Sequence, residues 1–183
     1  MAGLMIHLAV ANVVYDNNKE LIKDKKDFID GVNAPDILKV KYAFEGYADP
    51  REESHKMNLC KNFETLSGFE LGYFVHIITD HYFYKIFPFN ENFYHDYDST
   101  NKYFMEKYNI KIPKASLKGI PFKDEELIVL NIDELDKFIQ SFANISIKDE
   151  YSKFKYSDLN NKMLDEEDCF DEIITSRKKL PIY

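Results

Sequence analysis

The stretch LGYFVHIITDHYF, residues 71–83, sets the tightest constraint on how this chain folds. It belongs to a longer run, about 62–87, in which apolar residues occur nearly all round a helical projection. Such a run predicts a long helix that is buried at the centre of a domain. The same run holds His76, Asp80 and His81, and burying a charge costs several kcal/mol unless a partner compensates it. We therefore expect a group inside the fold that compensates the buried charge.

Glycine and proline are too sparse for a fold built on frequent turns. The chain has 183 residues with 6 Gly and 6 Pro, whereas a β-sandwich needs turn residues at short, regular intervals. Apolar periodicity predicts helices over 4–15 and 90–108, and Asn131 with Glu134 resembles a capping box that opens another helix. We expect an all-α fold, although the segment ELIVL at 126–130 would also suit a short strand.

Gly31 and Pro35 are expected to separate two helices that follow the first helix. Gly31 suits the C-terminal cap of a polar helix over 18–30, and Pro35 disfavours the helical conformation in the residue before it. Asp36 would then lie in the first turn of the next helix, where the helix dipole favours a carboxylate.

The length of the chain suits one domain with a sizeable core. We predict a single helical domain over 1–183, built as a multi-helix bundle around the long apolar helix, with a metal site in the bundle core. The metal-binding core would occupy residues 1–100, and C-terminal helices of unknown role would occupy 122–183.

The charge balance bounds the partners of this protein. The formal net charge of −8 disfavours a large nucleic-acid or anionic-membrane surface, because both select clustered Lys and Arg. No apolar stretch reaches the roughly 18 residues of a transmembrane helix, so we expect no membrane span. The sequence leaves the oligomeric state open.

The N-terminus and the cysteines favour the cytoplasm over secretion. The run MAGLMIHLAVANVVYD has no positive residue before its apolar stretch, and His7 interrupts it, so we interpret it as a helix rather than a signal peptide. Cys60 and Cys169 lie far apart and in no Cys-x-x-Cys pattern. They are typical of free thiols in a reducing compartment.

The spacing of His76 and Asp80 predicts a metal site. Residues four apart project from the same face of a helix, about one turn from each other. Gly72 lies one turn earlier on this face, where the missing side chain would let another helix approach closely. A divalent cation would supply the charge that Asp80 needs. His81 lies about 140° round the helix from His76 and suits a supporting or structural role better.

Further residues carry the same ligand chemistry. His7 is the polar residue of the first apolar helix, Asp36 follows the Pro35 turn, His55 lies in a polar loop, and His95 is next to Asp96. Imidazole nitrogens and carboxylate oxygens suit zinc in a hydrolytic site. Each residue also has an ordinary explanation, since a single His on an apolar helix is more often hydrogen-bonded within the core.

The order of these residues resembles a known family. HLAVA near the N-terminus, then Gly31 to Asp36 as GVNAPD, then SH at His55, then ELGYFVHIITDH follow the pattern of the zinc-dependent phospholipase C family. Single-strand-specific nucleases share that architecture. The resemblance covers residues 4–85 approximately and is to a superfamily of phosphoric-ester hydrolases.

The resemblance implies a set of zinc ligands. Asp36, His55, His76 and Asp80 would bind one ion, and Asp80 would bridge to a second ion shared with His7 and the N-terminal backbone. Asp36 would also be the candidate catalytic base. Two zinc ions are the expectation, with one or three as alternatives.

A third ion would need residues that the chain matches only in part. His81 and His95 would supply its histidines, but Ser99 stands where the family has a glutamate, so that Asp96 or Asp98 would have to substitute. The chain also has no Trp, whereas the family has one at its mature N-terminus.

The sequence therefore predicts a zinc-dependent hydrolase that acts on a small phosphate ester or a phospholipid. A paired metal site is well suited to in-line phosphoryl displacement. Two alternatives stay open: a helical binding or structural protein whose metal serves stability alone or whose site is degenerate, and an HD-type phosphohydrolase that uses His95 and Asp96.

Overall fold

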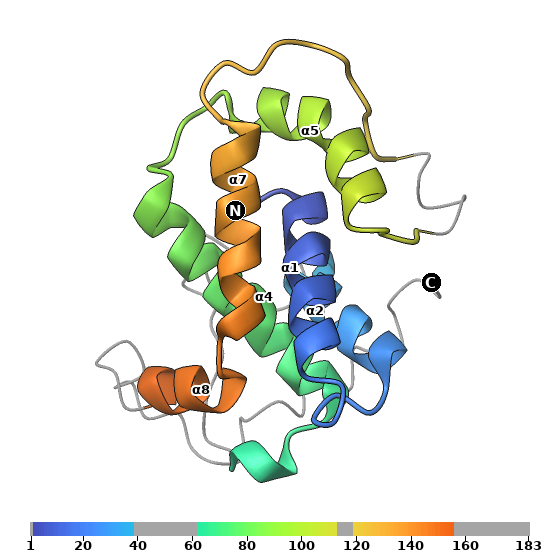
Figure 1. The fold of residues 1–183 in the computed structure, drawn as a ribbon, viewed down its shortest axis with the longest axis vertical. Helices are drawn as coiled ribbons and strands as arrows, with labels where there is room; N and C mark the ends of the chain where they lie inside the picture. The colour runs from blue at the N-terminus through green and yellow to red at the C-terminus, as the bar shows by residue number, and fades with distance from the viewer. Residues whose placement is uncertain (1, 39–61, 113–118, 156–183) are drawn as a thin grey trace. The chain divides into compact units, whose positions relative to one another are not determined.

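The computed structural model describes residues 2–38, 62–112 and 119–155, and all its regular elements are helical (Figure 1). Within these ranges there are six α-helices, two short 3₁₀-helices and no strand. The all-α prediction is confirmed. In chain order the elements are α1 (Leu4–Asn17), α2 (Lys25–Leu38), η1 (Phe63–Thr65), α4 (Gly68–Ile86), α5 (Phe93–Lys107), α7 (Ile132–Ser141), η2 (Phe142–Asn144) and α8 (Ile147–Lys155).

These elements belong to two compact units, each built from separate parts of the chain. The first unit combines Met1–Leu21 with Ile78–Asn144, and the second combines Ile22–Ile77 with Ile145–Ile182. Helix α4 contributes to both units, because it runs without a break through position 77. The single domain over 1–183 stays a prediction.

The first unit is organised around α1. This helix packs against α5, α7 and η2 (Figure 1). An aromatic cluster fills the space beside them, with ring centroids 4.8 to 6.0 Å apart. Its members are Phe83, Phe87, Phe93, Phe138 and Phe142. The helix predicted at 4–15 is thus confirmed, with a C-terminal end two residues later.

The start of α7 follows its sequence signal. The side-chain oxygen of Asn131 accepts hydrogen bonds from the backbone N–H groups of Asp133 and Glu134, at 2.9 and 3.2 Å. This N-cap satisfies donors that a helix cannot pair internally. The predicted N-terminus of this helix is confirmed. The segment 126–130 is not a strand, because its backbone donors bind a side chain instead, as described below.

The second unit is organised around a very close crossing of α2 and α4. A Cβ atom at Gly72 would lie 1.9 Å from the carbonyl oxygen of Phe28, and one at Gly31 would lie 1.9 Å from the carbonyl oxygen of Phe69. The two glycines therefore let the two helix backbones touch. The close approach predicted at Gly72 is confirmed, with α2 as the approaching helix.

Gly31 and Pro35 do not end a helix, contrary to expectation. Both lie inside α2, which runs from Lys25 to Leu38, so the predicted cap at Gly31 and turn at Pro35 are wrong. Gly31 is required for the contact with α4 rather than for a helix end. Pro35 lies in the last part of α2, where its missing N–H removes one hydrogen bond to the preceding turn. Asp36 consequently lies near the C-terminal end of a helix and not in a first turn.

Helix α4 begins later than its apolar pattern suggests. The run predicted from residue 62 contains a short 3₁₀-helix first, and α4 starts at Gly68. Ser67 and Glu70 form a reciprocal capping box: the backbone N–H of Ser67 donates to Glu70 at 2.7 Å, and that of Glu70 donates to the Ser67 hydroxyl at 3.2 Å. Asp27 of α2 accepts the N–H of Phe69 at 2.9 Å and ties the start of α4 to the same crossing.

None of the described helices is long and apolar enough to cross a lipid bilayer.

Candidate metal centre

In the first unit, the sequence-predicted ligands His7 and Asp80 lie side by side. The Nε2 atom of His7 is 3.3 Å from Oδ1 of Asp80, and both residues are buried, with 1% and 8% of their surface exposed. The same carboxylate oxygen accepts the backbone N–H of Ala2 at 2.7 Å. Because α1 starts at Leu4, the segment just before it reaches Asp80 together with His7. An imidazole, a carboxylate and the N-terminal backbone thus meet at one point.

In the second unit, His76 is held by α2. Its Nδ1 atom lies 2.7 Å from the carbonyl oxygen of Val32. A carbonyl oxygen can only accept, so Nδ1 carries the proton of the neutral ring and Nε2 carries the lone pair. A hydrogen bond from the second ring nitrogen to a backbone carbonyl is the arrangement that commonly orients metal-binding histidines. The close crossing at Gly72, one turn earlier on α4, brings Val32 within reach.

Asp36 belongs to the same part of the second unit. It lies one turn after Val32 on α2, and it offers a carboxylate oxygen within 4.8 Å of a ring nitrogen of His76. Asp36 is half-buried, whereas His76 is 1% exposed. An imidazole nitrogen and a carboxylate oxygen at this separation are a donor pair that suits zinc.

One helix carries ligand candidates from both units. His76 belongs to the second unit and Asp80 to the first, but both stand on α4, one turn apart. The predicted spacing on one helical face is therefore present as a local property of α4. His81 is half-buried, and its ring meets that of Tyr82 edge-on at 5.2 Å.

His95 and Asp96 bind residues of the segment 125–130. Asp96 is fully buried, and its carboxylate accepts the backbone N–H groups of Ile128, Val129 and Leu130 at 2.7 to 2.9 Å. His95 lies 3.0 Å from the same carboxylate through Nδ1, and its Nε2 lies 2.6 Å from Glu125. The pair therefore fastens the loop 119–131 to the start of α5.

The pKa values of this pair follow from those contacts. Burial opposes ionisation of Asp96, but the hydrogen bonds from Ile128, His95 and the next two amides outweigh it and hold its pKa below the usual range. The hydrogen bond to Asp96 raises the pKa of His95, with Glu125 adding to the effect. A carboxylate that already accepts four hydrogen bonds is poorly placed to bind a metal ion as well.

His55 lies outside the described residues, and so do Cys60 and Cys169. The residue patterns carried no signal for three groups that the structure brings to the candidate ligands, although the resemblance implied the N-terminal backbone: the carbonyl of Val32, the N–H of Ala2 and the carboxylate of Glu125. Two of these are backbone groups, which every residue has, so that only the tertiary packing selects them.

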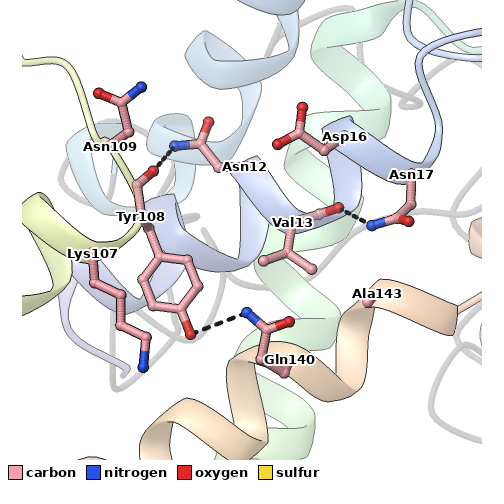
Figure 2. A pocket seen from close by; sticks show the side chains of 9 residues that line it. All are labelled: Asn12, Val13, Asp16, Asn17, Lys107, Tyr108, Asn109, Gln140 and Ala143. Atoms are coloured by element: carbon pink, nitrogen blue, oxygen red, sulfur yellow. Dashed lines mark hydrogen bonds between the residues drawn. The ribbon is translucent and has the colours of Figure 1, made fainter.

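A hollow of the first unit lies away from His7. Residues in the C-terminal half of α1 line it together with the end of α5 and the end of α7 (Figure 2). His7 stands in the first turn of α1, so this hollow is at the other end of that helix.

Comparison with protein-family models, with curated proteins and with solved structures found no match to this chain.

Proposed function

We propose that Asp36 and His76 bind a divalent metal ion, zinc by the chemistry of the donors, and that the protein hydrolyses phosphoric esters. The observation that carries the metal proposal is the 2.7 Å contact between Nδ1 of His76 and Val32, because it orients the ring and leaves Nε2 as the nitrogen that can bind a metal ion. The phosphoric-ester part rests on the resemblance of residues 4–85 to the zinc-dependent phospholipase C family.

The candidate ligands form two pairs, one in each unit, and α4 contributes a residue to both pairs. Asp36 lies close to His76 within the second unit, and His7 lies close to Asp80 within the first. His76 and Asp80 are one turn apart on a continuous helix, about 6 Å along its axis.

The donor set fits zinc, and its members take different roles. A zinc ion held by these residues would supply Lewis acidity for the hydrolysis of a phosphoric ester. His76 is oriented by Val32, and Asp80 is oriented by the N–H of Ala2. Asp36 is the most exposed of the four and is therefore the candidate that would take a proton from the attacking water. Asp80 with His7 is the pair that would hold a second ion, as the resemblance implies.

The first experiment measures metal content by elemental mass spectrometry on protein purified without a histidine tag. Wild type is compared with His76→Ala and Asp80→Ala, and His95→Gln is the matched control, because His95 is a histidine with carboxylate partners outside the proposed centre. We expect zinc in wild type and control, and loss of at least one equivalent in the other two. Absence of metal after reconstitution with zinc would refute the centre.

Hydrolysis is tested separately with bis(4-nitrophenyl) phosphate and with phosphatidylcholine in mixed micelles. We expect activity that needs zinc and that His76→Ala removes. Zinc binding without hydrolysis of either probe would instead support the structural alternative.

One observation favours that alternative, a metal that serves stability alone. His7 and His76 are both 1% exposed, and so deep a pair of ligands is typical of a closed structural site. No observation favours the HD-type alternative, because the carboxylate of Asp96 is engaged by three backbone N–H groups and by His95.

A further inference from the structure

The hollow at the C-terminal end of α1 is an open depression of the first unit, separate from the candidate ligands. It has a volume of about 380 Å³, within the range of about 300–1,000 Å³ that small-molecule sites occupy. Asn12 and Asn17 line it from α1, Tyr108 from the end of α5, and Gln140 from α7 (Figure 2). All of these residues belong to the first unit.

Three of the lining amides have their N–H groups directed at the protein itself. Nδ2 of Asn12 donates to the carbonyl of Tyr108 at 3.1 Å, and Nδ2 of Asn17 donates to the carbonyl of Val13 at 2.8 Å. Nε2 of Gln140 donates to the hydroxyl of Tyr108 at 3.3 Å (Figure 2). A backbone carbonyl can only accept, so the amides of both asparagines must face it with nitrogen. The three side chains therefore present carbonyl oxygens as acceptors for a ligand.

The position of the Tyr108 side chain is fixed by a hydrogen bond to Asp136. Its hydroxyl donates to Oδ1 of Asp136 at 2.9 Å, and Tyr103 donates to the other oxygen of Asp136 at 2.7 Å. Burial raises the pKa of Tyr108 to about 12, so the phenol keeps its proton at neutral pH and continues to donate. The wall of the hollow is thus organised before any ligand arrives, which lowers the entropic cost of binding.

Two charged groups at the hollow already have ion-pair partners of opposite charge. The ammonium group of Lys107 forms an ion pair with Asp136, and the carboxylate of Asp16 lies 3.0 Å from Lys19. An anion would meet several carbonyl oxygens, and a cation would meet the ammonium of Lys107. An uncharged ligand rich in hydrogen-bond donors avoids both penalties.

We propose that this hollow binds an uncharged, hydroxyl-rich small molecule, a monosaccharide or a cyclic polyol. Hydroxyl groups donate to the three amide oxygens, and they also accept from a donor such as Lys107. Tyr108 also lines the hollow. The site is distinct from the proposed metal centre, since Asn12 follows His7 by five residues, about 7.5 Å along α1.

The test is an NMR titration of the side-chain amide signals of the full chain with D-glucose and with myo-inositol. We expect the Asn12, Asn17 and Gln140 signals to shift with saturable dependence on at least one of the two. Gln140→Ala should weaken that binding about three- to tenfold, the worth of one hydrogen bond. Gln140 is exposed, so this variant is expected to fold.

Lys137→Ala is the matched control, because Lys137 is exposed on the same helix and does not line the hollow. The control should bind as wild type does. Inorganic phosphate and putrescine are titrated in parallel as an anion and a cation of small size. The proposal is overturned if neither sugar nor polyol shifts these signals up to its solubility limit, or if only phosphate or putrescine does. It is also overturned if Gln140→Ala binds as tightly as the control.

Discussion

The carbonyl oxygen of Val32 lies 2.7 Å from Nδ1 of His76, at the point where α2 and α4 approach most closely. The contact depends on two glycines, Gly31 and Gly72, since a Cβ atom at either would strike the backbone of the opposite helix. A packing feature and a candidate ligand are therefore coupled: the separation of the two helices also sets the orientation of the imidazole.

The first prediction tests this crossing with Gly72→Ala. The added Cβ would lie 1.9 Å from the carbonyl oxygen of Phe28, and no side-chain rotation can relieve a contact with backbone. Overpacking should lower the free energy of unfolding by about 3 kcal/mol, whereas the better helix propensity of alanine should raise it by about 1 kcal/mol. The expected net loss is about 2 kcal/mol. Urea denaturation measures the difference.

Gly68→Ala is the control for that substitution. Its Cβ would lie 3.0 Å from the carboxylate end of Asp27 and 3.3 Å from the carbonyl oxygen of Asp24, so a shift of a few tenths of an ångström relieves both contacts. The control should stay within about 1 kcal/mol of wild type. Equal losses in both variants would show that the crossing of α2 and α4 is not as tight as described.

The second prediction concerns metal removal. If zinc binds only the folded protein, free zinc at one hundred times its dissociation constant stabilises by about 2.7 kcal/mol. Treatment with a chelator should therefore lower the melting temperature, and added zinc should restore it. Asp80→Ala should abolish this response, whereas His95→Gln should keep it. A melting temperature that is the same with and without zinc would count against the proposed centre.

The third prediction concerns the buried carboxylate of Asp96. Asp96→Ala removes the acceptor of three backbone N–H groups in the segment Ile128–Leu130, and a donor left without an acceptor away from water, as at the buried Leu130, costs about 1–3 kcal/mol, to which the loss of the buried Asp96 side chain adds. We expect a loss of about 3 kcal/mol or more in the free energy of unfolding, measured by urea denaturation.

Asp98→Ala provides the comparison for Asp96. Asp98 is partly exposed and forms an ion pair with Lys123 at 3.2 Å. Surface ion pairs contribute about 0–1 kcal/mol, so this variant should change stability little. A similarly small effect of Asp96→Ala would mean that the loop does not depend on the carboxylate.

The fourth prediction concerns pH. The hydrogen bond to Asp96, and then that to Glu125, raises the pKa of His95 above its ordinary value of 6.5. Because the folded state favours the protonated ring, this contribution to stability is fully present below the unfolded pKa, about 6.5. It is lost as the pH rises through the higher folded pKa. An NMR titration of the His95 ring should therefore give a midpoint above 6.5.

Glu125→Gln should move that midpoint down, because it removes one of the two carboxylates that face the ring. Glu126→Gln is the neighbouring control, since Glu126 is exposed and is not among the groups that raise the pKa of His95. If the midpoint of wild type fell at or below 6.5, the interactions of His95 with Asp96 and Glu125 would be absent in solution.

Much of the fold could be predicted from local patterns. Apolar periodicity predicted α1, α5 and α7. The side-chain oxygen of Asn131 caps α7 at the position that the Asn131–Glu134 pattern predicted. The spacing of Gly72, His76 and Asp80 on one helical face also needed no tertiary information, since it follows from 3.6 residues per turn. Even the close approach at Gly72 could be inferred, because a glycine on a buried helical face leaves room for another backbone.

The start of α4 shows a local signal that the apolar pattern concealed. Ser67 and Glu70 have the spacing of a capping box, yet apolar residues before them suggested a longer helix. Hydrophobicity around a helix does not define its ends, because burial and helix termination have different physical causes.

Gly31, Pro35 and Asp96 depended on the tertiary structure. Glycine and proline commonly end helices, but Gly31 lies within α2 because only its missing side chain lets the backbone of α4 approach at Phe69. Asp96 binds the backbone of residues 128–130, more than 30 positions away along the chain. Local propensities act over a few residues, whereas these contacts join distant segments and select backbone groups that all residues share. The sequence by itself thus determined the helices and the faces of their polar residues, and only the packing decided which groups those residues meet.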